Sequence, residues 1–342
     1  MIKSYKILFL TTIFLSTLIS ISSYSWLGMW LGLEINLLSI IPLMHNQSNV
    51  LSTESAIKYF IVQAIASTII LLSIISMMMK MNILSNINFQ STFMLSMNSA
   101  LLTKMGMAPF HFWFPEVMEG LDWMNCLLIL TWQKIAPMIL LMYNMKFIMF
   151  MSIIIMTSMI ISGIMGVNQI SLRKILAYSS INHMGWMMST MLIMETVWIY
   201  YFLIYTVISI NLVLILSSLK IFFLNQLYQS MNTNMMTKMF FIMNFLSLSG
   251  IPPFLGFMPK WLTIQTLLNN QMMFLPTMMI ILTLITIYMY MRITLSTLLM
   301  NINELNWNMN MKTNKFKSFY LSMMNFITLS SLILITVTFN ML

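Results

Sequence analysis

The feature that most constrains this chain is a succession of apolar runs, each about as long as a bilayer is thick. Of its 342 residues, 60% are hydrophobic and only 7% are charged. We therefore expect an all-α polytopic membrane protein, with residues 1–342 forming a single membrane-embedded domain and no soluble domain. Because roughly 20 apolar residues in a helix cross the hydrocarbon core, the sequence predicts eleven spans, at residues 7–24, 26–44, 56–79, 92–114, 122–144, 147–167, 173–194, 197–219, 239–267, 272–298 and 318–340.

The basic residues divide unequally between the two predicted membrane faces. The face opposite the N-terminus carries two of those in loops and terminal segments, Lys80 and Lys146. The face with the N-terminus carries nine: Lys3, Lys6, Arg173, Lys174, Lys220, Lys238, Lys312, Lys315 and Lys317. Such a bias marks the side that is not translocated. The net charge of +9 therefore reflects membrane orientation and not nucleic-acid binding. The first run follows basic residues and precedes no small-residue cleavage site, so we expect a retained signal-anchor helix.

The composition argues against a cofactor site in this chain. Its single cysteine, Cys126, cannot form an internal disulfide, and its three histidines form no cluster for a metal or haem. The sequence contains neither a G-x-G-x-x-G motif nor a Walker motif. We therefore expect no nucleotide, metal or redox cofactor to be bound by this chain.

The stretch from Ser99 to Glu119 places Lys104 in the middle of a membrane-length apolar run. Pro109 lacks a backbone N–H and Gly106 is conformationally permissive, so we expect the helix to break there. Broken helices at membrane depth need protein or water to cover their free backbone groups, and transporters build ion sites from them. The alternative is a proline kink whose lysine extends to the membrane surface.

Two later lysines lie in similar surroundings. Pro137 follows Lys134 and frees the carbonyl of the preceding residue, which predicts another helix break. A structural pairing of Lys134 with some other polar side chain is the alternative. Lys260 follows Pro252 and Pro253 in a second broken span, although it lies late enough in that span to reach the surface instead.

Glu34 is the only acidic residue near the middle of a predicted span. Together with the three lysines, it makes four buried charges, which would cost on the order of 10 kcal/mol if left unpaired. We therefore expect these side chains to face one another or water. An opposite charge within a few ångströms favours an ionised group, so Glu34 is predicted to pair with Lys104. No acid is placed to pair with Lys134, which is predicted to exchange its proton as a switch.

His183 is the only histidine deep within a predicted span. Its spacing from Ser179 and Trp186 places all three on one helix face. A hydrogen-bonded packing histidine is one interpretation. A proton relay is the other, because imidazole titrates near neutral pH.

Five motifs carry a family resemblance: LGLEINLLS, TKMGMAPFHFWFPEVMEGLDW, TWQKIAPM, SLRKILAYSSINHMGWM and SGIPPFLGFMPKW. In this order and spacing they resemble the chain 2 family of mitochondrial NADH:ubiquinone oxidoreductase (respiratory complex I), in the form found in insects and related animals. These proteins are antiporter-like subunits of the membrane arm. The resemblance covers essentially the whole chain, and the 44 methionines suggest an animal mitochondrial gene in which ATA is read as methionine.

The resemblance implies a proton channel built from two broken helices around a central hydrophilic axis. Carried over by motif, Glu34 and Lys104 would form the pair of one half-channel. Lys134 would be the central lysine and Lys260 the lysine of the second half-channel, with His183 a weaker candidate. The glutamate lies on the second span and not the fifth, which resembles the animal form that lacks the first three helices of the fourteen-helix core.

The resemblance also implies a function. The chain would help couple electron transfer from NADH to ubiquinone, in other subunits, to proton translocation across the mitochondrial inner membrane. NADH, FMN, iron–sulfur clusters and ubiquinone would belong to those subunits. Expected partners are the antiporter-like chain 4, the small chain 4L and lipids such as cardiolipin. The N-terminus would face the matrix and the C-terminus the intermembrane space.

Two alternatives stay open at this point. One is a free-standing cation/proton antiporter, against which the lack of a second midplane acid counts. The other is a structural spacer of the membrane arm that does not conduct protons. Four buried charges argue against a spacer, because a spacer does not need them.

Overall fold

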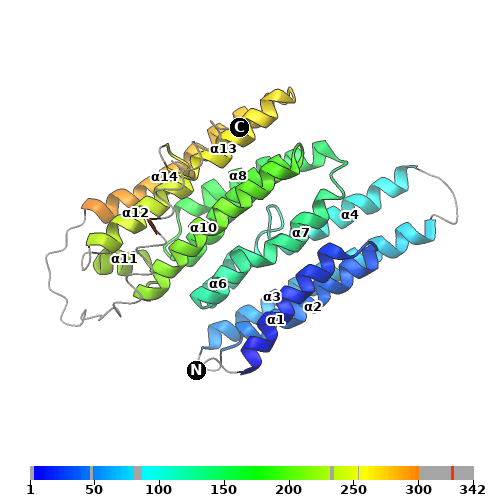
Figure 1. Ribbon diagram of the computed structural model, residues 1–342, viewed down its shortest axis with the longest axis horizontal. Helices are drawn as coiled ribbons and strands as arrows, with labels where there is room; N and C mark the ends of the chain where they lie inside the picture. Colours follow the sequence, from blue (N-terminus) through cyan, green and yellow to red (C-terminus); the bar gives the residue numbers. More distant parts are fainter. Residues whose placement is uncertain are drawn as a thin grey trace. The chain divides into compact units, whose positions relative to one another are not determined.

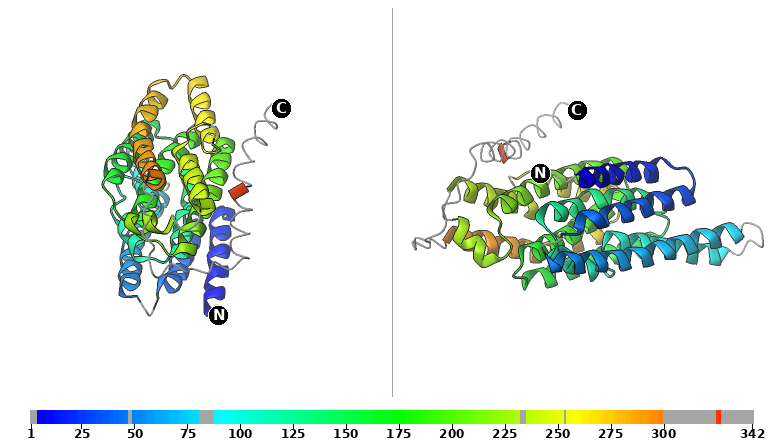
Figure 2. Two further views of the ribbon diagram at one scale, coloured as in Figure 1. Left: turned by 90° about the vertical axis from the view of Figure 1, so that its left-hand side faces the viewer. Right: turned by 90° about the horizontal axis from the view of Figure 1, so that it is seen from below.

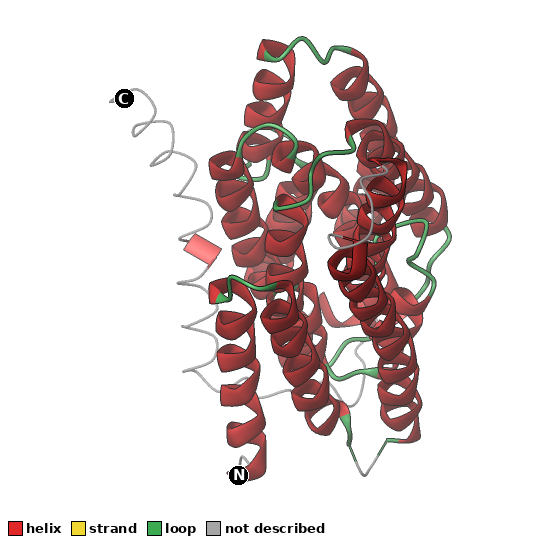
Figure 3. Cartoon of the chain, turned by 90° about the vertical axis from the view of Figure 1, so that its right-hand side faces the viewer, coloured by secondary structure: helices red, strands yellow, loops and turns green. Residues whose placement is uncertain are grey.

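The computed structural model describes residues 4–46, 49–80, 87–231, 235–252, 254–299 and 325–326. Within these ranges the chain is built from helices and connecting loops, and Figure 3 shows no strand among them. An isolated antiparallel bridge pairs Ser171 with Phe223. The expected all-α fold is therefore confirmed.

Fourteen helices are described (Figure 1). Thirteen of them overlap ten of the eleven predicted spans, and the helix Leu224–Met231 lies in the predicted connection between spans 197–219 and 239–267. The eleventh predicted span, 318–340, lies outside the described residues except at 325–326. The helices are α1 (Ser4–Ser22), α2 (Trp26–Met44), α3 (Val50–Lys80), α4 (Ile87–Met105), α5 (Trp113–Gly120), α6 (Trp123–Leu130), α7 (Trp132–Met142), α8 (Ile148–Val167), α9 (Leu172–Met191), α10 (Glu195–Leu219), α11 (Leu224–Met231), α12 (Met235–Ser249), α13 (Phe257–Asn269) and α14 (Phe274–Leu299).

Seven segments of the described chain are long and apolar enough to cross a membrane: α1, α2, α3, α6 together with α7, α8, α10 and α14. Two further predicted spans are the broken pairs α4–α5 and α12–α13. The last is α9, which is not apolar enough to qualify, yet all of its residues except Lys174 are buried. It packs against α10, α13 and α14, so protein and not lipid surrounds its polar side chains.

The helices pack into two compact units, Met1–Ile154 and Ile155–Leu342. In the first unit α1 lies beside α2 (Figure 2), α3 packs against α2, α4 and α5, and α7 packs against α1, α4 and α6. In the second unit α10 packs against α9, α12 and α13, while α14 packs against α12 and α13. The expectation of a single membrane domain stays a prediction.

The first of the two predicted broken helices is interrupted at Gly106. The backbone of Gly106 is left-handed, with φ of 72°. Its N–H donates to the carbonyl of Thr103 at 3.1 Å, and the N–H of Met107 donates to the carbonyl of Leu102 at 3.1 Å. This pair of bonds is the Schellman arrangement that ends helices at glycine. Pro109 lies in the loop that leads to α5.

The second broken helix ends in a similar way. Gly250 follows the last residue of α12, has φ of 74° and donates its N–H to the carbonyl of Ser247 at 3.1 Å. Pro252 lies in the segment before α13, and Pro253 lies outside the described residues. Each break therefore places a left-handed glycine directly after the first half-helix.

The predicted helix break at Pro137 is wrong. Pro137 lies inside α7, and the interruption falls at Thr131, between α6 and α7. Pro137 removes one backbone hydrogen bond, to the carbonyl of Gln133, and the residues on both sides of it stay helical.

Candidate functional site

Lys104 lies in the last turn of α4 and is buried, with 8% of its surface exposed. Side chains from two neighbouring helices cover the carbonyls at this helix end. Gln63 Nε2, from α3, donates to the carbonyl of Lys104 at 3.2 Å. Trp113 Nε1, from α5, donates to the carbonyl of Thr103 at 3.0 Å. The helix break at Lys104 is thus covered by protein, and the lysine does not extend to the surface.

Glu34 does not contact Lys104 directly. Within the described residues no ion pair joins them, so the predicted direct pair is corrected. The physical reason is that α3 packs against both α2, which carries Glu34, and α4, which carries Lys104. Glu34 is half-buried, so the prediction that it is a buried charge is also corrected. Any coupling between Glu34 and Lys104 would have to act through space, because no direct contact joins the two side chains.

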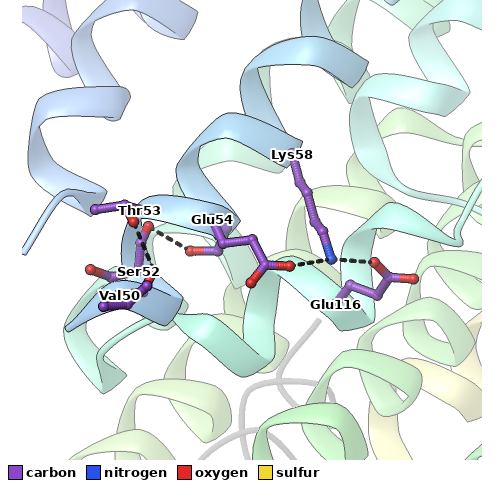
Figure 4. A network of polar contacts seen from close by, with 7 residues as sticks. Val50, Ser52, Thr53, Glu54, Lys58 and Glu116 are labelled. Atoms are coloured by element: carbon purple, nitrogen blue, oxygen red, sulfur yellow. Dashed lines mark hydrogen bonds and ion pairs between the residues drawn. The ribbon is translucent and has the colours of Figure 1, made fainter.

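Direct ion pairs join Lys58 to two carboxylates at the surface of the first unit (Figure 4). Lys58 Nζ lies 2.9 Å from Glu54 Oε1 and 2.9 Å from Glu116 Oε2. Glu54 and Lys58 belong to α3, and Glu116 belongs to α5. These pairs therefore link α3 to the second half of the broken helix.

Lys134 lies in the first turn of α7 and is 1% exposed. Its Nζ is 5.4 Å from the centroid of the Phe114 ring, which comes from α5. The residue before it, Gln133, exchanges two hydrogen bonds with Asn36 of α2. Sequence reasoning missed these two amides, although each lies within two residues of a predicted buried charge.

Lys260 lies in the first turn of α13 and is 6% exposed. Its Nζ donates to the carbonyl of Ser249 at 2.7 Å, and lies 5.9 Å from the centroid of the Trp186 ring. Ser249 is the last residue of α12, so Lys260 reaches back across the break. A Cβ at Gly250 would lie 2.8 Å from this Nζ. The alternative that Lys260 extends to the surface is therefore wrong.

His183 lies at the centre of a polar cluster in the second unit. Its Nδ1 is 2.9 Å from the hydroxyl of Tyr201, and its ring centroid is 5.2 Å from that of Tyr205. One residue earlier, Asn182 Nδ2 donates to Thr286 Oγ1 at 3.2 Å. No periodic pattern pointed to Tyr201 as a site residue, because it lies within the apolar run of α10.

The described residues contain no group of three or more histidine, cysteine, aspartate or glutamate side chains placed to hold a metal. The chemistry available at these sites is therefore that of amines, one carboxylate, an imidazole and hydroxyl groups. Such groups can accept, hold and release protons.

Two structural comparisons show the fold. A chain of respiratory complex I from Thermus thermophilus has a TM-score of 0.85 at 20% identity, covering 97% of this chain and 78% of that chain. A chain of the Mrp complex from Dietzia sp. DQ12-45-1b has a TM-score of 0.71 at 16% identity, covering 83% and 59%. The chain therefore has the antiporter-like helical fold.

Sequence comparisons show the family. A family model described as NADH:quinone oxidoreductase/Mrp antiporter, TM, matches residues 23–286. NADH-ubiquinone oxidoreductase chain 2 of Anopheles gambiae is 46% identical, covering 97% of this chain and 97% of its own length. The protein of the same name from Locusta migratoria is 47% identical, covering 92% and 91%. Because these matches span nearly the whole length of both partners, the chain belongs to the NADH-ubiquinone oxidoreductase chain 2 family.

Proposed function

We propose that this chain is a membrane-arm subunit of a proton-translocating NADH:ubiquinone oxidoreductase, respiratory complex I. It couples electron transfer in other subunits to proton translocation across the membrane. The observation that carries this proposal is the placement of three buried lysines in turns next to helix interruptions. A buried lysine at a helix centre costs roughly 2.5–3.5 kcal/mol on insertion scales, and a purely structural spacer gains nothing from it.

The proposed roles follow the two broken helices. Glu34 and Lys104 serve the first half-channel, and any coupling between them acts through space. Lys134 is the central site of proton exchange. Lys260 serves the second half-channel, supported by its bond to the carbonyl at the break. His183, hydrogen-bonded to the Tyr201 hydroxyl, is a further relay candidate.

The proposal extends to location and partners. The bias of basic residues supports a matrix-facing N-terminus and a C-terminus in the intermembrane space of mitochondria. The neighbouring subunits are the antiporter-like chain 4 and the small chain 4L, with cardiolipin among the bound lipids. The chain itself binds no cofactor, and NADH, FMN, iron–sulfur clusters and ubiquinone are held by other subunits of the complex.

Two substitutions at Lys134 test the function. Lys134→Met keeps the length and the apolar packing of the side chain but removes the exchangeable proton, so the complex assembles while NADH-driven pumping falls. Lys134→Arg also impairs pumping, because a guanidinium group stays charged and cannot release its proton. The measurement pairs complex abundance with protons pumped per electron, and Lys146→Met in an exposed loop is the control.

Two results would count against this function. If Lys134→Arg pumps normally while Lys134→Met does not, a fixed positive charge is sufficient and proton exchange at Lys134 is excluded. If both variants pump normally in assembled complex, the chain acts as a spacer. Sodium-dependent proton movement without NADH would instead favour a cation/proton antiporter, whose fold this chain shares.

A further inference from the structure

Asn36 and Gln133 form a reciprocal amide pair between two helices of the first unit. Asn36 Nδ2 donates to Gln133 Oε1 at 2.8 Å, and Gln133 Nε2 donates to Asn36 Oδ1 at 2.9 Å. The two residues are 97 positions apart in the chain. Asn36 is 4% exposed, so this link between α2 and α7 is inside the protein.

The Asn36–Gln133 amide pair anchors the first turn of α7, where Pro137 removes one backbone hydrogen bond. The interruption at Thr131 comes immediately before α7, and Pro137 lies one turn further along. Because Pro137 has no N–H, the carbonyl of Gln133 loses its helical donor. The N–H of Lys134 donates to the carbonyl of Thr131, three residues back, at 3.3 Å. The side chain of Gln133 therefore supplies an anchor that the backbone of this turn lacks.

The positions of the two amides connect this anchor to the charged residues. Gln133 directly precedes Lys134 in α7, and Asn36 follows Glu34 by two residues in α2. Amide side chains do not ionise, so the pair can fix two helices without adding a competing charge. It thus joins the helix that carries the half-buried Glu34 to the helix of the central lysine.

We propose that Asn36 and Gln133 are positioning residues that hold the turn of Lys134 against the helix that carries Glu34. Proton exchange at Lys134 depends on this geometry. This inference rests on the proposed function, because it concerns how Lys134 is placed for that role. Neither amide transfers a proton itself.

The test uses Asn36→Leu, Gln133→Leu and the exchanged pair Asn36→Gln with Gln133→Asn, each in the intact complex. The exchange moves one methylene across the contact and keeps both hydrogen bonds. We expect the leucine variants to lower protons pumped per electron by about half or more, since a misplacement of ~1 Å can slow a reaction about 100-fold. The exchanged pair restores the ratio.

A matched control removes another buried amide contact in the same unit. Asn98 Nδ2 donates to the carbonyl of Asn144 at 3.2 Å, so Asn98→Leu removes a comparable bond away from Lys134. It is expected to alter complex abundance and leave the pumping ratio unchanged. If the leucine variants at 36 and 133 do not assemble, Gln133→Asn alone keeps the amide but shortens its reach, and it is expected to lower the ratio.

Three results overturn the inference. The first is a normal number of protons pumped per electron in the assembled leucine variants at 36 and 133. The second is an equal fall of that number in Asn98→Leu. The third is failure of the exchanged pair to restore pumping. Failure of the proposed function is distinguishable, because Lys134→Met then pumps normally. If Lys134→Met abolishes pumping while the amide variants do not, only the positioning inference fails.

Discussion

At the scale of single residues, the buried lysines of the two broken helices lie next to the helix interruptions, and one of them binds a backbone carbonyl at a helix end. Lys260 donates to the carbonyl of Ser249, the last residue of α12. The carboxyl end of a helix carries roughly half a negative charge, so it stabilises an ammonium group less firmly than a carboxylate contact does. Lys104 likewise has no direct ion pair with a carboxylate among the described residues.

Glu34→Gln tests a through-space coupling between Glu34 and Lys104. The substitution removes the negative charge that would favour protonated Lys104, so protons pumped per electron should fall. The control is Glu54→Gln, which removes a carboxylate from an exposed ion pair on α3. The ratio is measured in assembled complex, and an unchanged ratio in Glu34→Gln would exclude the coupling.

At the scale of elements, the two broken helices end by the same device. Gly106 and Gly250 both have left-handed backbones, and each directly follows the first half of its helix. An added Cβ would lie 2.9 Å from Phe114 Cβ at the first glycine and 2.8 Å from Lys260 Nζ at the second. Glycine is therefore required both by backbone conformation and by the side chain that packs against it.

Alanine at these glycines should destabilise the complex. The left-handed conformation costs alanine roughly 1–2 kcal/mol, before the close contacts are counted. Gly163→Ala is the comparison, because Gly163 lies inside α8 with an ordinary backbone, and an added Cβ there would meet Ile285 Cγ2 at 3.2 Å, a milder contact than at Gly106 or Gly250. Thermal inactivation of the complex is the measurement, and equal tolerance at Gly163 and Gly250 would contradict the argument.

At the scale of the whole molecule, loop pairing brings basic residues of the second unit to one end. The N–H of Leu172 donates to the carbonyl of Phe222 at 2.9 Å, next to the bridge between Ser171 and Phe223. This pairing joins the start of α9, with Arg173, to the segment after α10, with Lys220. The Arg173 guanidinium also lies 4.6 Å from the Phe222 ring centroid. The clustering agrees with the sequence-based assignment of both residues to one membrane face.

Tags at the two termini test the predicted orientation. With the N-terminus in the matrix, a C-terminal tag is expected to be cleaved by protease once the outer membrane is opened, while an N-terminal tag stays protected. Solubilised membranes, in which both tags are accessible, are the control. Protection of the C-terminal tag in mitoplasts would refute the eleven-span count.

The sequence by itself determined the helical class, the positions of most helices, the break at Gly106 and the three buried lysines, whereas Glu34 is only half-buried. These features are local, because they depend on the length of an apolar run, on glycine and on ionisable residues within it. Hydropathy alone does not identify α9 as a membrane span, because α9 carries polar residues. Neighbouring helices bury those residues. A run that faces protein need not be apolar.

Only the tertiary structure decided which groups meet. It separated Glu34 from Lys104 by packing α3 against the helices of both, and it directed Lys260 to the carbonyl of Ser249. It also joined Asn36 to Gln133, 97 positions away. These contacts depend on the relative rotation and depth of packed helices, which no local pattern in the sequence specifies.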